Sequence, residues 1–182
     1  MYDFSHFKRQ GQETVEWLKR EFSGIRTGRA TPAILDNVSV ESYGTLMKVK
    51  EISSIVGVDA KSLRVAPWDM SQAKNIEKGI VAADLGLSVA VDDKGLRVIF
   101  PELSAERRQA LLKVAKGKLE EGRVAIRGER EKVKEDIEKK EKAGGMGEDD
   151  KWRFMEDLKK LVDGFNKDLE AAYERKEKEI QE

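Results

Sequence analysis

The chain has 182 residues, of which 38% are charged, 39% hydrophobic and 7% aromatic. Because an average globular protein has roughly 25% charged residues, this composition favours elongated helices with a narrow apolar seam over a deep spherical core. The absence of cysteine excludes disulfides and thiol chemistry, and no apolar run approaches the roughly 20 residues of a membrane span. The N-terminus is too mixed in charge for a signal peptide, so we expect a cytoplasmic protein that does not enter a membrane.

Charge is distributed unevenly along the chain. Basic and acidic residues each total 35, which gives a formal net charge of zero. Residues 104–134 nevertheless contain ten basic and five acidic residues, whereas residues 135–182 contain eleven basic and sixteen acidic residues. The acidic end therefore conceals a basic segment, and the net charge of zero does not argue against a nucleic-acid partner.

Residues 4–28 have the pattern of an amphipathic helix. Its apolar residues step by three or four positions and so share one stripe: Val15, Leu18, Phe22 and Ile25. Gly11 and Gly24 each weaken this helix by about 1 kcal/mol relative to alanine, so tertiary packing must support it. Pro32 closes the segment, because the residue before a proline avoids the helical region.

The period changes to that of strands after Pro32. Alternating apolar residues predict strands over 35–40 and 46–52, and a β-branched run predicts another over 62–67. Residues 88–100 have the pattern of a hairpin with a glycine in its turn.

One helix is predicted within this strand-rich region. Ser71 has the character of its N-cap, and Gly86 follows its end. The region is therefore a small α+β unit, which Pro101 ends.

Two more helices follow. Ser104 is predicted to cap the first, whose stripe is nearly heptad: Leu112, Ala115, Leu119, Gly122, Ile126, Val133 and Ile137. A glycine-rich break at 143–147 precedes the second, whose stripe alternates steps of three and four: Met155, Leu158, Val162, Phe165, Leu169 and Ala172. Three such stripes predict one three-helix bundle, because no stripe can bury itself alone.

The predicted architecture is discontinuous. Residues 1–30 and 104–182 form the bundle, and residues 31–103 form an inserted α+β domain. Two short connections join them and are predicted to act as a hinge. The hinge residues are Ala30, Thr31, Pro32, Leu103 and Ser104.

Groups that could carry catalysis are scarce. The single histidine is His6, near the N-terminus, and no Glu-x-x-His motif or glycine-rich phosphate loop is present. Asp92 and Asp93 are adjacent carboxylates, but a turn explains them better than a metal site does. We therefore expect a protein that is not an enzyme and has no catalytic residue, metal or cofactor.

Two groups of arginines are candidates for binding phosphate. Arg26 and Arg29 lie near the end of the first helix, where they could grip phosphates or interact with the helix dipole. Arg123, Arg127 and Arg130 step by four and three residues and so share one helix face.

The arginines of the later helix have two interpretations as well. They could form a solvated face paired with neighbouring glutamates: Glu120, Glu121 and Glu129. A row made of arginine without lysine favours phosphate recognition, because the guanidinium group binds phosphate in a planar, bidentate way. RNA is favoured over duplex DNA, because no helix-turn-helix or zinc module is present.

Five motifs occur in order along the chain: IRTGRATP at 25–32, IEKGIVAADLGL at 76–87, PELSAERR at 101–108, VAIR at 124–127 and KEKEI at 176–180. Together they resemble the ribosome recycling factor family. The resemblance covers nearly the whole chain. It implies an L-shaped molecule with a three-helix bundle and a small β/α/β domain joined by a hinge.

The resemblance also implies a function and partners. A recycling factor binds the post-termination ribosome through large-subunit ribosomal RNA and, with elongation factor G and its GTP hydrolysis, separates the subunits to release mRNA and tRNA. Arg26 and Arg29 match arginines of the family's first helix. Arg127 and Arg130 match arginines of the second helix that face RNA, and Arg130 is the strongest candidate. We expect a monomer, because the three stripes can satisfy one another.

The match weakens after Arg127. The family usually has asparagine, an apolar residue and two arginines there, where this chain has Gly128, Glu129, Arg130 and Glu131. These departures motivate a first alternative function, in which the protein binds ribosomes but inhibits or stores them instead of separating their subunits. A helical scaffold that binds another protein through its acidic last helix is the second alternative.

Overall fold

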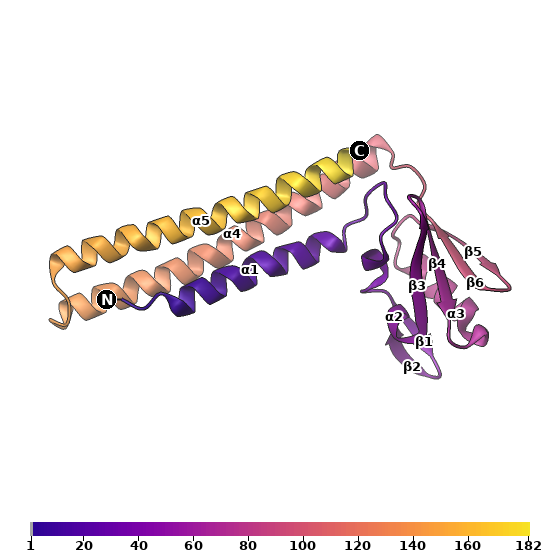
Figure 1. The fold of residues 1–182 in the computed structure, drawn as a ribbon, viewed down its shortest axis with the longest axis horizontal. Coiled ribbons are helices and arrows are strands. Elements are labelled where there is room, and N and C mark those ends of the chain that lie inside the picture. The colour runs from indigo at the N-terminus through magenta and orange to yellow at the C-terminus, as the bar shows by residue number, and fades with distance from the viewer. Residues whose placement is uncertain (1) are drawn as a thin grey trace. The chain divides into compact units, whose positions relative to one another are not determined.

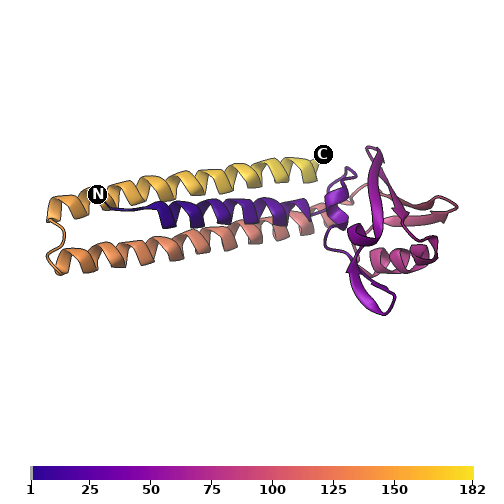
Figure 2. The ribbon, with the colours of Figure 1, turned by 60° about the horizontal axis from the view of Figure 1, so that its bottom comes forward.

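The computed structural model describes residues 2–182, and its three long helices form a bundle. Helix α1 spans Ser5–Ser23, α4 spans Ala105–Lys142 and α5 spans Glu148–Gln181. Figures 1 and 2 both show these helices running side by side. The predicted class, a helical bundle with an inserted α+β domain, is confirmed.

The chain divides into two compact units. One holds the chain up to Phe22 together with Lys113–Glu177, and the other holds Ser23–Leu112 together with Lys178–Glu182. These limits fall inside helices α4 and α5. The domain limits drawn from the sequence, 1–30 with 104–182 and 31–103, stay a prediction.

The core of the bundle follows the predicted stripes. Helix α1 buries Phe7, Val15, Leu18 and Phe22, α4 buries Ala115, Leu119, Gly122, Ile126 and Ile137, and α5 buries Leu158, Val162 and Leu169. Gly11 is also buried, because the ring of Phe165 packs directly onto its backbone. The tertiary support that a glycine in this helix requires is therefore supplied by α5.

The ends of the long helices have local causes in the sequence. The backbone N–H of Arg107 donates to the Oγ of Ser104 at 3.2 Å, which confirms Ser104 as the N-cap of α4. After α4 the chain turns at Gly144, whose φ of +74° is a backbone conformation that glycine adopts readily. Helix α5 then opens with three acidic residues, which complement its positive N-terminal end.

The second unit contains a four-stranded antiparallel sheet in the order β3-β4-β6-β5. Its strands are β3 Ser53–Asp59, β4 Ser62–Pro67, β5 Ser88–Asp92 and β6 Gly95–Ile99. Helix α3, Ala73–Ala82, packs against the sheet, and a hairpin of β1 Ser39–Ser42 and β2 Thr45–Lys48 lies beside that helix. Alternating residues of β4 and β6 meet the apolar side of α3 in the core: Leu63, Val65, Leu96, Val98, Ile76 and Ile80.

Several local predictions in this unit were wrong. Helix α1 ends at Ser23 and not near Gly28, and Leu35, which was predicted to begin a strand, is the last residue of a 3-10 helix, Pro32–Leu35. Val49–Ile52 forms the short helix α2, in which Val49 and Ile52 are three residues apart and both point inward. A helical turn satisfies this spacing as well as alternation does.

The start of α3 also differs from its prediction. The N-cap position of α3 is Gln72, which makes no side-chain capping bond, and not Ser71. A short 3-10 helix, Met70–Gln72, precedes α3, and Asp69 caps that helix: its carboxylate accepts the backbone N–H of Ser71 at 2.9 Å. The hairpin predicted over 88–100 is confirmed, with β5 and β6 meeting at Gly95.

Candidate nucleic-acid interface

The three arginines of α4 share one face of the helix, as their spacing predicts. Arg123 and Arg130 are partly exposed, with side-chain exposures of 36% and 44%, and Arg127 is exposed. The buried residues Gly122 and Ile126 lie next to this face and anchor it to the bundle core.

Two lysines extend the same face. Lys116 lies seven residues before Arg123, and Lys134 lies four residues after Arg130, so helical spacing aligns them with the arginines. Both spacings are present in the sequence, but the predicted row contained arginines only. We refer to this set as the basic row: Lys116, Arg123, Arg127, Arg130 and Lys134.

Carboxylates of the same bundle occupy much of the basic row. Arg123 donates to Glu120 at 2.6 Å and forms an ion pair with Glu170 of α5. Arg130 forms an ion pair with Glu131. Within residues 2–182, Arg127 has no ion-pair or hydrogen-bond partner for its side chain.

Glu131 has two basic neighbours. Arg130 hydrogen-bonds its carboxylate and holds the pKa of Glu131 below its ordinary value, with the nearby charge of Lys134 adding to the effect. The Nζ of Lys134 lies 4.0 Å from Glu131 and also 4.0 Å from Glu138. The charge reversal at Glu131 therefore neutralises part of the basic row at neutral pH.

Glu129 points to another side of α4. Its side chain is 17% exposed, and it pairs with Lys132 at 2.6 Å and lies 3.9 Å from the Nε2 of His6 in α1. The carboxylate thus stands at the edge of the seam between α1 and α4 and does not pair with the arginines. Of the glutamates predicted to pair with the arginines, Glu120 does so, whereas Glu121 pairs with Lys118 at 3.0 Å.

Arg26 is placed differently from its prediction. Only 6% of the residue is exposed, and its guanidinium donates to the carbonyl oxygens of Gly86, at 2.8 Å, and of Pro101. A weaker bond reaches the carbonyl of Leu85 at 3.4 Å. Arg26 is therefore a buried tie within the α+β unit and not a surface ligand for phosphate. Arg29, by contrast, is exposed.

Burial also affects the charge of Arg26. It lowers the pKa of Arg26 from its ordinary value, and the nearby charge of Arg107 adds to this effect. An arginine nevertheless stays protonated at neutral pH. The guanidinium therefore acts as a charged donor to backbone carbonyls.

The five predicted hinge residues lie in ordered local structure. The N–H of Ala30 donates to the carbonyl of Ala60 at 2.8 Å, and Thr31 and Pro32 begin the first 3-10 helix. Leu103 is buried, and Ser104 caps α4. Whether these residues act as a hinge stays a prediction.

The fold and this site define a class of protein: a three-helix bundle with an inserted α+β domain that exposes a row of basic side chains. In the part of the chain that the structure describes, no three His, Cys, Asp or Glu side chains gather as they would around a metal ion. Within residues 2–182, no helix combines the length and apolar character needed to cross a membrane.

Comparison with known proteins gives one consistent family. The family described as ribosome recycling factor matches residues 18–180. The ribosome-recycling factor of Bifidobacterium longum (strain DJO10A) is 43% identical over 175 residues, which cover 96% of this chain and 96% of the relative. That of Rubrobacter xylanophilus is 38% identical over 180 residues, which cover 99% and 97%.

Solved structures agree. The solution structure of a ribosome recycling factor matches with a TM-score of 0.74 and 33% identity, covering 100% of this chain and 99% of the other. Models of the T. thermophilus ribosome recycling factor and E. coli elongation factor G bound to the E. coli post-termination complex include a chain that matches with a TM-score of 0.66 and 34% identity, covering 97% and 96%. The chain belongs to the ribosome recycling factor family, whose members are non-enzymatic translation factors.

Proposed function

We propose that this chain binds the post-termination ribosome in the cytoplasm and, together with elongation factor G and GTP, separates the subunits so that mRNA and tRNA are released. The similarity to a recycling factor bound with elongation factor G to a post-termination complex supports this proposal. Nucleotide hydrolysis belongs to the partner.

The basic row is the proposed contact with ribosomal RNA of the large subunit. The observation that carries this assignment is the exposure of Arg127 without a side-chain partner in the described chain, in a line with four other basic residues. Phosphate contacts from such a row position a protein on RNA without reading its sequence. Exposed Arg29 is proposed as a further RNA contact, whereas Arg26 is not.

The bundle, the inserted domain and the hinge have different roles in subunit separation. The bundle, residues 1–30 and 104–182, anchors on RNA as a monomer, while elongation factor G acts on the inserted domain, residues 31–103. The hinge residues absorb the rotation of one body against the other. These are Ala30, Thr31, Pro32, Leu103 and Ser104.

The first test is subunit separation followed by light scattering. We expect a fall in scattering when post-termination ribosomes, elongation factor G, GTP and the protein are all present, and no fall when any one is omitted. Tight binding without separation would instead favour an inhibitor or storage factor. The absence of any ribosome binding would refute the proposal and favour the scaffold alternative.

Substitutions in the basic row test the RNA contact. Arg127→Ala is expected to weaken ribosome binding by about 10- to 100-fold, because a lost hydrogen bond to a charged group costs about 1.5–3 kcal/mol. Arg130→Ala is expected to lose less, since Arg130 must first leave Glu131 before it can bind phosphate. Equal affinity of Arg127→Ala and the wild type would reject the basic row as the contact.

Glu131→Gln tests the neutralising carboxylate directly. We expect tighter ribosome binding, because Arg130 and Lys134 lose an internal partner that competes with phosphate. Glu135→Gln is the matched control: it removes the same charge from an exposed position one turn further along α4. An equal gain for both variants would show that only net charge matters.

A further inference from the structure

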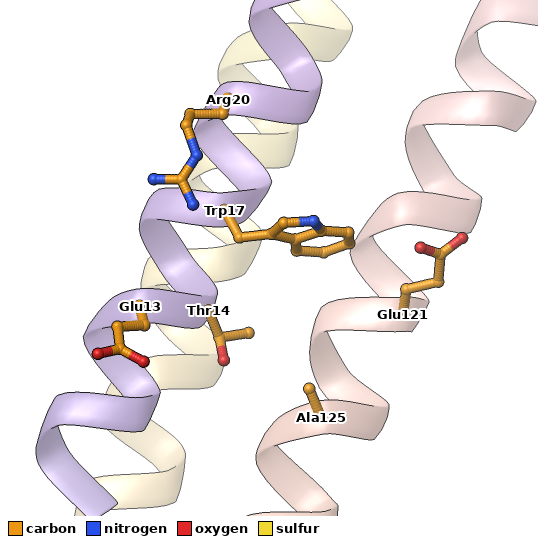
Figure 3. Close-up of a pocket in the computed structure, with 6 residues that line it drawn as sticks. All are labelled: Glu13, Thr14, Trp17, Arg20, Glu121 and Ala125. Atoms are coloured by element: carbon orange, nitrogen blue, oxygen red, sulfur yellow. The ribbon is translucent and has the colours of Figure 1, made fainter.

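A groove lies between α1 and α4, on a different side of α4 from the basic row. Its volume is about 490 Å³, and its lining residues are Glu13, Thr14, Trp17 and Arg20 of α1 with Glu121 and Ala125 of α4. Figure 3 shows the indole of Trp17 reaching from α1 toward α4 across this groove. The volume is within the roughly 300–1,000 Å³ that small-ligand sites occupy.

The indole meets different chemistry at the two ends of the groove. The Nζ of Lys118 lies 5.6 Å from the centroid of the Trp17 ring, within the range of a cation–π contact. Lys118 lies about one helical turn before Glu121 on α4, and Ala125 lies about one turn after it. The small side chains of Ala125 and Thr14 leave the other end hollow, beside the indole.

The charges at the groove balance one another. Its lining contains two carboxylates, Glu13 and Glu121, and one guanidinium, that of Arg20. Lys118, beside the indole, already pairs with Glu121 at 3.0 Å and with Glu21 at 3.4 Å. The groove therefore favours a neutral planar group over an ion.

A nucleobase has these properties. It is planar and carries no charge at neutral pH, and its flat π-face can stack on an aromatic side chain. Proteins that recognise RNA often splay out single-stranded bases and stack them on aromatic side chains. In Figure 3 the ring of Trp17 bridges the space between the two helices, where such a base could lie against it.

We propose that this groove binds one unpaired nucleobase of RNA, stacked on Trp17. The inference rests on the proposed function, because ribosomal RNA is the RNA that a recycling factor meets. Helix geometry of about 100° per residue places Glu121 and Ala125 roughly opposite Arg123 and Arg130 on α4. The bundle then contacts RNA on two faces: one through phosphates at the basic row, the other through a base at Trp17.

The test compares Trp17→Ala, Trp17→Phe and the control Trp152→Ala in binding to post-termination ribosomes. Trp152 is 68% exposed on α5 and lies outside the groove. We expect Trp17→Ala to weaken binding by about 5- to 150-fold, which corresponds to a stacking energy of about 1–3 kcal/mol. Trp17→Phe should keep most of the affinity, because it retains an aromatic face, and Trp152→Ala should bind as the wild type does.

A second variant leaves the indole in place. Ala125→Leu narrows the hollow end of the groove while keeping a good helix-forming residue. It should weaken binding as Trp17→Ala does, without loss of helical content by circular dichroism. If both variants bind with wild-type affinity while Arg127→Ala binds weakly, the base site is rejected and the proposed function stands.

Chemical footprinting of the ribosomal RNA identifies the class of occupant. The wild type should protect a nucleotide that Trp17→Ala leaves exposed, and Trp17→Phe should restore that protection. Weaker binding by Trp17→Ala with an unchanged RNA footprint would assign the groove to a protein and overturn the proposal. Failure of the wild type to bind ribosomes at all would refute the proposed function itself.

Discussion

Arg26 is the arginine whose role, as a structural residue or as a ligand for RNA, a substitution can decide most clearly. The side chain is buried and ties the segment after α1 to Gly86 and to Pro101 within one unit. We expect Arg26→Met to lower the free energy of unfolding, because it removes the charged donor that the carbonyl oxygens of Gly86 and Pro101 accept from. Ribosome affinity measured on folded protein should change little in comparison.

The magnitude follows from the bonds. Hydrogen bonds that involve a charged group contribute about 1.5–3 kcal/mol each, and Arg26 makes two close ones besides the weak one to Leu85. Its guanidinium also lies 6.0 Å from the centre of the Phe100 ring. A loss of about 3–6 kcal/mol is expected for Arg26→Met, and about half of that for Arg26→Lys, whose single ammonium cannot replace the planar fork.

Urea unfolding followed by circular dichroism measures this loss. Arg29→Met is the matched control, since Arg29 lies three residues further along and is exposed. We expect its free energy of unfolding to stay within about 0.5 kcal/mol of the wild type. The opposite result would be an Arg26→Met variant that unfolds as the wild type does but binds the ribosome with a weaker salt dependence. A decrease of about 0.7–0.9 in the slope of log binding constant against log salt concentration corresponds to one lost phosphate contact. That result would mean that Arg26 binds phosphate, and the structural reasoning would be wrong.

Three further substitutions test the bundle. Gly11→Ala should lower the free energy of unfolding by about 1–3 kcal/mol, because its methyl group would overlap the ring of Phe165. Gly128→Ala, in an open part of α4, should raise it by up to about 1 kcal/mol in the same urea assay. Asp136 accepts hydrogen bonds from Lys140, one turn further along α4, and from the hydroxyl of Tyr2 at 2.6 Å. Both bonds hold the pKa of Asp136 below its ordinary value. Their stabilisation is full above the unfolded pKa of about 3.9 and is lost as pH falls. Tyr2→Phe should therefore unfold more easily than the wild type at pH 7, and this difference in the free energy of unfolding should become smaller in acid.

The parts of the fold that depend on local spacing could be predicted from the sequence. The stripe of α4 needs only the helical period, and the cap of Ser104 depends on a residue three positions away. Strand β3 lacked such a signal. Its later residues, including Val56 and Val58, are exposed, so burial does not alternate along it and periodicity could not find the strand.

The candidate site shows the same division between local and distant causes. The spacing of the arginines on α4 predicted one exposed face. The partner of Arg123 on α5 is 47 residues away in the chain, and the carbonyl partners of Arg26 are 59 to 75 residues away. These partners depend on how the elements pack, so a single sequence read segment by segment could not reveal them.

The pairing within the basic row changes what its charge implies for RNA binding. A phosphate that binds Arg123 or Arg130 must replace a carboxylate, so the gain is the difference between two similar ion pairs and is small. Arg127 has no such partner among the described residues, and its contact with phosphate replaces only water and counterions. The salt dependence of ribosome binding should therefore be shallower than five basic residues would give at about 0.7–0.9 log units each. Glu131 belongs to this chain, so when Arg130 binds phosphate the released carboxylate stays beside the RNA and continues to repel it. Removing that one charge should therefore strengthen ribosome binding more than adding a lysine elsewhere on the surface.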